Sequence, residues 1–201
     1  MLNRRKMAAP TIVQEHVTMV SYLLSHCEEY IDTGYIPDGT EVISCTFQGT
    51  NMNKAYSQCL YGTDNICLSW IQGYPSLIAF YGDSETRLDG AKYDNKATVE
   101  VDCTGLTVSG YTSVNKALNG GVPASTKPMY LLKSNGRRGF ANLFVNPFYG
   151  KFYGLTITKN GAVIHDYKPA VNDTGVGCVY DAVTGRVYYN AGTGAFEWGD
   201  E

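Results

Sequence analysis

Two carboxylates alternate along one apolar run of the chain, Glu100 and Asp102 in the segment from Ala97 to Cys103. Alternate residues of a β-strand project from the same face, so this pair would share one side of a strand. Paired carboxylates are the acid and nucleophile, or acid and base, of glycoside hydrolysis. Because the residues between and beside them are apolar, the simpler interpretation is the solvent face of a half-buried strand.

The three histidines, His16, His26 and His165, stand near no nucleophile motif such as Gly-x-Ser-x-Gly. His165 lies between Ile164 and Asp166 in a strand-like segment, where a hydrogen-bonded structural histidine is expected. The sequence also shows no P-loop and no Gly-x-Gly-x-x-Gly turn that leads into a helix, which argues against nucleotide binding. We therefore expect a protein that is not an enzyme.

The cysteines are scattered and have no zinc-site spacing: Cys27, Cys45, Cys59, Cys67, Cys103 and Cys178. Most lie in strand-like runs, where free cysteine behaves as a small buried hydrophobe, so reduced thiols are expected. Cys59 and Cys67 would be placed to bridge a hairpin, which the sequence alone does not decide.

No cofactor is expected, and calcium is the one ion for which the loops offer ligands. Asp64-Asn65, Asp94-Asn95 and Asn172-Asp173 supply the oxygen atoms that Ca²⁺ prefers. Each is equally an ordinary turn sequence, so both interpretations stay open.

A group of aromatic and polar residues in the middle of the chain has the composition of a sugar-binding surface. Sugar rings stack on aromatic side chains, and their hydroxyls bond to amides and carboxylates. The candidate residues are Trp70, Gln72, Tyr74, Tyr81, Asp83, Tyr93, Asn95 and Tyr111. The alternative is that tyrosines pack at sheet edges and that Trp70 is a core residue, which is the favoured interpretation for Trp70.

The composition narrows the class of protein. The chain has 201 residues, of which 44% are hydrophobic and 17% charged, with a net charge of -3. A slightly acidic chain without a basic stripe is not expected to bind nucleic acid. No apolar run reaches the length of a membrane span, and TIVQEHVTMV is too polar for the core of a signal peptide, so we expect neither membrane insertion nor a cleaved signal.

Alternating polarity and turn residues predict many short strands. In the segment from Glu41 to Gln48, Ile43, Cys45 and Phe47 share an apolar face, and from Lys151 to Thr158 we expect Tyr153, Leu155 and Ile157 to share one. The other expected strands are 30–37, 58–61, 66–72, 76–81, 97–103, 106–109, 162–167, 176–183, 186–190 and 195–198. Residues 16–27 are typical of either a short helix or a strand.

Two hairpins and one long loop complete the prediction. Asn160-Gly161 joins the strands on either side of it, and Thr184-Gly185 joins the next two. The stretch from Asn115 to Pro128 is a loop within one domain, because strands on both sides need each other to bury their apolar faces. The fold class is therefore all-β, a two-sheet antiparallel sandwich of jelly-roll type.

Three segments together resemble a known type of domain: EEYIDTGYIPDGTEV, FYGKFYGLTITKNGAVIHDYKPA and TGVGCVYDAVTGRVYYNAGTGAFEWG. They resemble the concanavalin A-like (LamG-like) jelly roll found in tail, fibre and decoration proteins of phages and prophages from gut bacteria. The resemblance covers residues 28–199 and implies a sandwich domain over 28–201, preceded by a tail or attachment arm over 1–27. We interpret Tyr180, Asp181 and Tyr188 as markers of the fold rather than of a ligand site, and expect a positive φ at Gly192 and Gly194.

The resemblance also bears on catalysis. Glucanases of this sandwich type carry Glu-x-Asp-x-(x)-Glu on one strand, and here Thr104 and Gly105 follow Glu100-Val101-Asp102 where the last glutamate would stand. One of the two carboxylate roles therefore has no occupant.

The function expected from the resemblance is that of a non-enzymatic virion protein, a capsid decoration, head-fibre or tail component. Its sandwich would adsorb to host or mucosal glycans outside the cell, and Arg4, Arg5 and Lys6 would attach the tail to other virion proteins. Such proteins often form trimers, although no heptad repeat specifies one here. The alternative is a free bacterial carbohydrate-binding module or glycan hydrolase of the same fold.

Overall fold

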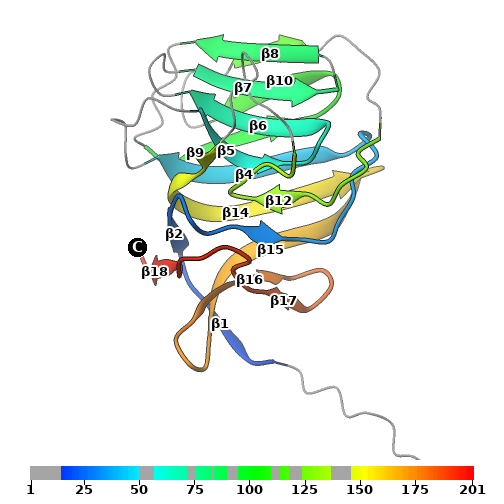
Figure 1. The fold of residues 1–201 in the computed structure, drawn as a ribbon. Coiled ribbons are helices and arrows are strands. Elements are labelled where there is room, and N and C mark those ends of the chain that lie inside the picture. The colour runs from blue at the N-terminus through cyan, green and yellow to red at the C-terminus, as the bar shows by residue number, and fades with distance from the viewer. Residues whose placement is uncertain are drawn as a thin grey trace, which may run out of the picture.

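The computed structural model describes residues 15–49, 57–71, 76–82, 84–89, 95–109, 114–117, 124–136 and 146–201. Throughout these ranges the regular elements are strands, which form two stacked sheets (Figure 1). Within the same ranges, no helix has the length and apolar character needed to cross a membrane. The all-β sandwich expected from the sequence is confirmed.

The larger sheet contains the N-terminal and C-terminal strands and both predicted hairpins. Its order is β11 (Val114–Ala117), β10 (Gly105–Ser109), β9 (Ala97–Val101), β4 (Val42–Gly49), β14 (Tyr149–Lys159), β15 (Ala162–Asn172), β16 (Gly177–Asp181) and β17 (Arg186–Tyr188). Three short strands attach beside this path: β1 (Val17–Met19) on β15, β2 (Tyr22–His26) on β14, and β18 (Glu197–Gly199) on β2.

The smaller sheet covers the part of the larger sheet that lies away from β16 and β17 (Figure 1). Its order is β3 (Ile31–Asp32), β12 (Tyr130–Leu131), β5 (Ser57–Gly62), β6 (Ile66–Ile71), β7 (Ser76–Tyr81) and β8 (Ser84–Asp89). The short β13 (Asn146–Pro147) pairs in parallel with β5, whereas the other described pairs of strands are antiparallel. Strands β6–β8 lie away from the β16–β17 hairpin, and that hairpin extends past the smaller sheet (Figure 1).

The core fills the space between the two sheets. Strand β4 follows its alternation: Ile43, Cys45 and Phe47 are fully buried, whereas the residues between them are half-buried. Burying one face of each sheet against the other removes the apolar surface from water, which is the main stabilising contribution in a sandwich. The largest fully buried side chains include Trp70, Tyr61, Phe47 and Phe152.

The prediction for β14 is wrong at one residue. Leu155 and Ile157 are buried, but Tyr153 lies on the opposite face and is half-buried. The pairing of β14 with β4 shifts register between Phe152 and Gly154, so a β-bulge reverses the facing of the residues before it. Phe152 takes the core position that the simple alternation assigned to Tyr153.

The N-terminal boundary also differs from the expectation. Residues 17–19 and 22–26 are strands of the larger sheet, so part of the segment expected to be an arm belongs to the sandwich. Arg4, Arg5 and Lys6, and the rest of residues 1–14, lie outside the described residues. The ambiguity between helix and strand over residues 16–27 is resolved in favour of strands.

The two glycines of the closing segment serve a different purpose from the one expected. Gly192 and Gly194 do not have a positive φ. Instead, a Cβ on Gly192 would stand 1.9 Å from the carbonyl oxygen of Glu28, and one on Gly194 would stand 2.1 Å from Oε1 of Glu29. Glycine is required there because the chain passes directly against the segment before β3.

The predicted cysteine pair lies on the smaller sheet, away from the main core. Cys59 and Cys67 are buried with Ile78 and Phe80, and their sulfur atoms are 3.3 Å apart, longer than a disulfide bond. We call Cys59 and Cys67 the buried thiol pair. All six cysteines are thiols in the structure, and burial raises the pKa of Cys59 well above its ordinary value.

Candidate functional site

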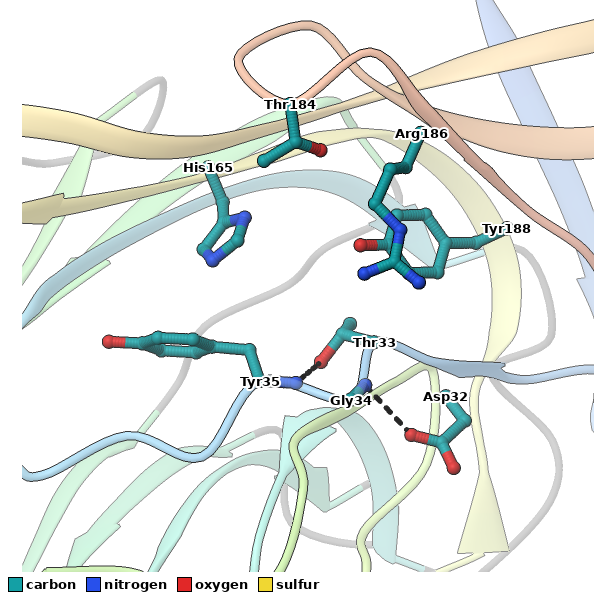
Figure 2. Close-up of a pocket in the computed structure, with 8 residues that line it drawn as sticks. All are labelled: Asp32, Thr33, Gly34, Tyr35, His165, Thr184, Arg186 and Tyr188. Carbon is teal, nitrogen blue, oxygen red and sulfur yellow. Dashed lines mark hydrogen bonds between the residues drawn. The ribbon is translucent and has the colours of Figure 1, made fainter. Parts of the chain in front are cut away.

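A pocket of about 470 Å³ opens where the segment after β3 faces the β16–β17 hairpin and β15 (Figure 2). The segments that form it are about 150 residues apart in the sequence, and the packing of the two sheets brings them together, since β3 belongs to the smaller sheet and β15–β17 belong to the larger one. Its walls combine aromatic, hydroxyl and charged side chains, with residues Asp32, Thr33, Gly34, Tyr35, His165, Thr184, Arg186 and Tyr188.

The first wall is a turn held by its own side chains. The Asp32 carboxylate accepts a hydrogen bond from the N–H of Gly34 at 2.9 Å, and Gly34 adopts a φ of 67°, which favours glycine. The hydroxyl of Thr33 donates to the carbonyl of Met129 at 2.6 Å and accepts from the N–H of Tyr35 at 3.1 Å. This turn is why the strand expected over residues 30–37 is confined to Ile31–Asp32.

Tyr35 is fixed by a buried carboxylate behind the pocket. Its hydroxyl donates to Oε1 of Glu41 at 2.6 Å, and the same carboxylate accepts from the N–H groups of Asp38 and Gly39. Burial, and then the hydrogen bond and charge of Glu41, raise the pKa of Tyr35 well above its ordinary value. The phenol therefore stays neutral at physiological pH and presents its ring to the pocket.

The second wall is His165, which a buried aspartate orients. Its Nδ1 lies 2.8 Å from Oδ2 of Asp181, a fully buried carboxylate that also accepts from the N–H groups of Asp166 and Val183 and from the Thr184 hydroxyl. Burial raises the pKa of Asp181, but these hydrogen bonds outweigh it and hold the pKa below its ordinary value. An ionised Asp181 accepts from Nδ1–H of His165, which orients the ring and leaves Nε2 directed away from Asp181.

Aromatic contacts connect the two walls. The ring of His165 lies edge-on to Tyr35 at 4.8 Å between centroids and stacks on Tyr167 at 5.4 Å. Tyr167 in turn meets the ring of Tyr188 edge-on at 5.7 Å. These contacts fix the ring orientations and make one side of the pocket aromatic.

Arg186 and Tyr188 project from the same face of β17, two residues apart, and complete the pocket. The guanidinium carbon of Arg186 lies 5.4 Å from the centroid of the Tyr188 ring, within the range of a cation–π contact. In Figure 2 the guanidinium and the His165 ring point into the pocket, whereas the Asp32 carboxylate is bonded to the backbone of Gly34. The arrangement offers a ligand aromatic faces, hydroxyls, an imidazole and one cation.

Two residues of the predicted sugar-binding surface lie in the core. Trp70 and Tyr81 are buried between the sheets with exposures of 0% and 2%, so neither offers a face to a ligand; for Trp70 this is the interpretation favoured above. Asn95 is exposed. The remaining candidates, Gln72, Tyr74, Asp83, Tyr93 and Tyr111, lie outside the described residues.

The carboxylate pair follows the simpler of its two interpretations. Glu100 is exposed on β9, and Asp102 lies beyond the strand end, where its carboxylate accepts from the N–H groups of Thr104 and Gly105. Asp102 therefore closes the turn between β9 and β10, a role that aspartate commonly has.

Two of the three calcium candidates use their oxygen atoms in hydrogen bonds to the backbone, Asp64 with a segment that is distant in the sequence and Asn172 within its own turn. Asp64 accepts hydrogen bonds from the backbone N–H groups of Thr126 and Lys127, and Asn172 accepts from those of Thr174 and Val176. Asp94 lies outside the described residues. Within the ranges that are described, His, Cys, Asp and Glu side chains form no group of three suited to a metal ion.

The pocket was not predicted as a site, although its segments were noticed. YIDTGY lies in a segment expected to be a strand, and Tyr188 of TGRVYY is interpreted as a marker of the fold; in the structure, residues of both segments line one cavity. The sequence does contain one local signal for the site: Arg186 and Tyr188 are two residues apart in a strand that follows a turn, so their side chains share one face of that strand. No local signal indicates that residues 32–35 lie opposite them.

Comparison with known proteins defines the class of fold. No protein-family model matches the chain, and no curated protein sequence matches it. Among solved structures, a proposed carbohydrate-binding protein from Bacteroides ovatus ATCC 8483 is similar over 92% of this chain, with a TM-score of 0.60 and 15% sequence identity. The likeness covers 61% of that protein, so the chain spans about three fifths of its length, and at this identity it shows a shared fold.

A second similar structure is that of Scytalido-glutamic peptidase with a peptide-based transition-state analogue. It matches 91% of this chain and 100% of its own, at 12% identity and a TM-score of 0.42, a likeness too weak to support an argument.

Proposed function

We propose that the protein is a carbohydrate-binding module that holds a sugar in the pocket between Tyr35 and Tyr188. The observation that carries the proposal is a concave site in which aromatic rings and polar groups converge on one space. Sugars need both, because their C–H faces pack on aromatic rings while their hydroxyls require hydrogen-bonding partners. Carbohydrate binding proposed for a protein of the same fold is consistent with this function.

The site is proposed to bind and not to cleave. Asp32 is the one carboxylate among the described residues that line the pocket, whereas glycoside hydrolysis uses two carboxyl groups on either side of the bond. His165 is oriented to hydrogen-bond to a sugar hydroxyl, and Thr184 adds a hydroxyl at the rim.

A glycan array followed by calorimetric titration of the best ligands tests this function. Tyr188→Ala removes an aromatic wall and is expected to weaken binding about tenfold, because a central aromatic contact contributes about 1–2 kcal/mol. Tyr189→Ala is the matched control, since Tyr189 follows directly in sequence but does not line the pocket. Absence of binding to every glycan, or equal losses in both variants, would contradict the proposal.

Placement in a virion stays a prediction. The residues expected to attach the protein, Arg4, Arg5 and Lys6, lie outside the described part of the chain, and none of the comparisons bears on a phage origin. A glycan-binding module would serve equally in a virion or as a free bacterial protein. Sedimentation of the protein with purified virions, with and without residues 1–14, distinguishes the two.

A further inference from the structure

We infer that the pocket selects sugars that carry a negative charge, and that hexuronic acid residues are its ligands. The inference rests on the proposed function, because it names the class of sugar that the same site would hold. Its basis is Arg186, whose charged group faces the pocket and has no ion-pair partner among the described residues (Figure 2).

Arg186 is the one Lys or Arg among the described residues that line the pocket; Lys96 and Lys133 likewise contact tyrosine rings, those of Tyr153 and Tyr30, but do not line it. Lys151, Lys159 and Lys168 each lie within 3.0 Å of a carboxylate oxygen, of Glu201, Asp38 and Asp166 respectively. Within the described residues, by contrast, the side chain of Arg186 forms no ion pair and no hydrogen bond, and its one specific contact is the ring of Tyr188. Its guanidinium is therefore available to a ligand.

None of the described carboxylates near the pocket forms an ion pair with Arg186. Asp181 lies behind His165, and its two oxygens are occupied by hydrogen bonds from Asp166, Val183, Thr184 and His165. Asp32 is bonded to the backbone N–H of Gly34. Glu41 lies behind Tyr35 and is bonded to its hydroxyl. An incoming carboxylate would thus meet Arg186 as the group that still lacks a counter-ion.

The chemistry of the guanidinium favours a carboxylate. Its planar fork of N–H donors binds both oxygens of a carboxylate at once, which a neutral hydroxyl cannot match. The contact with Tyr188 keeps the fork beside an aromatic face, so a sugar ring packed on that face would present its carboxylate to Arg186. A sulfate ester offers similar oxygens, and the experiment must separate these two sources of negative charge.

The test compares each acidic sugar with its uncharged counterpart. Oligomers of galacturonate, glucuronate and mannuronate are titrated into the protein by calorimetry, each beside its methyl ester, which keeps the ring and removes the charge. Sulfated galactose oligomers form a separate arm. We expect at least one uronate to bind about tenfold or more tightly than its ester, as for a charge-assisted hydrogen bond.

Variants locate the effect. Arg186→Gln should remove the preference for the acid over the ester, and Arg186→Lys should restore part of it, because lysine keeps the charge but lacks the fork. Lys168→Gln makes the same change of net charge on the opposite face of β15 from His165 and should leave the preference intact. Thermal unfolding of each variant shows whether it is folded.

The outcomes separate this inference from the proposed function. Equal affinity for acid and ester, or an unchanged preference in Arg186→Gln, overturns the inference and leaves neutral glycan binding in place. Tight binding of the sulfated oligomers alone overturns the assignment to hexuronic acids. No binding to any sugar, charged or neutral, overturns the proposed function as well.

Discussion

Replacing Asp181 with asparagine tests how the pocket is held in shape. Oδ1 of Asp181 accepts from the N–H groups of Asp166 and Val183, at 3.0 and 3.1 Å, and Oδ2 accepts from Nδ1 of His165 and the Thr184 hydroxyl, at 2.8 and 2.6 Å. Asparagine keeps one acceptor oxygen and puts an NH₂ donor in place of the other. Two short charge-assisted hydrogen bonds are lost or must be rebuilt with His165 and Thr184 as acceptors.

The expected cost follows from those bonds. Hydrogen bonds to a charged group contribute about 1.5–3 kcal/mol each, and rebuilding as neutral bonds recovers part of the loss. We expect Asp181→Asn to lower the free energy of unfolding by about 2–4 kcal/mol at pH 7. For a domain of this size that corresponds to a fall in Tm of roughly 5–15 °C.

The effect should depend on pH in one direction. The folded-state pKa of Asp181 is lower than its ordinary value, so the carboxylate stabilises the fold above an unfolded-state pKa of about 3.9. That stabilisation is lost as the pH falls through the folded-state pKa. The difference between the wild type and Asp181→Asn should therefore be constant from pH 7 to pH 5 and shrink below about pH 4.

Urea unfolding followed by circular dichroism at several pH values measures both quantities. Asp166→Asn is the matched control, because Asp166 is on the adjacent strand but its carboxylate faces Lys168 and Thr156 at a half-exposed site. Its expected cost is under about 1 kcal/mol. A cost below about 0.5 kcal/mol for Asp181→Asn, or a cost that persists unchanged at pH 3, would refute the reasoning.

Three further results are expected. Gly192→Ala should destabilise the fold by about 2 kcal/mol or more, because its Cβ would meet the Glu28 carbonyl, whereas Gly175→Ala, at an open turn with a φ of 83°, should cost about 1 kcal/mol; chemical denaturation measures both. The buried thiol pair should not react with Ellman's reagent until the protein unfolds, since burial keeps both sulfurs from solvent. In Trp198→Phe the remaining fluorescence, that of buried Trp70, should resist quenching by acrylamide, whereas quenching as strong as in the wild type would place Trp70 at the surface.

Local pattern predicted the strands well and the positions of side chains less well. Alternation along β4 identified its buried face because the strand has no irregularity there. The same rule misplaced Tyr153, because one extra residue in β14 reverses the faces and leaves no mark in the alternation itself. Gly154, which has a φ of 146°, is the nearest signal, since glycine in a strand often accompanies a bulge.

The site could not be predicted from local sequence because its parts meet only through the fold. Trp70 and Tyr81 are residue types that commonly bind sugar rings. Whether an aromatic ring binds a ligand or packs in the core depends on its burial, and for these two residues the opposite sheet determines the burial. Conversely, Tyr35 and Tyr188 belong to segments that the sequence predicts as strands, 30–37 and 186–190, with no sign of a ligand site. Their facing arrangement depends on how the two sheets pack against each other, which no local pattern specifies.

The pocket is preorganised by a buried carboxylate behind each of its two walls. Glu41 fixes the ring of Tyr35, and Asp181 fixes His165 together with the turn that leads to Arg186. Because these side chains are already ordered, a ligand does not have to immobilise them, and each ordered side chain spares about 0.5–1.5 kcal/mol on binding. Each hydrogen bond between a sugar hydroxyl and the protein replaces a similar bond to water, so it contributes little to the affinity. A rigid site lowers the cost of binding and so allows such modest contacts to give a measurable affinity. Arg186 is the exception among these side chains, because a single cation–π contact holds it in place. Fixing the Arg186 side chain on binding therefore costs free energy, which its charged interaction with the ligand must offset.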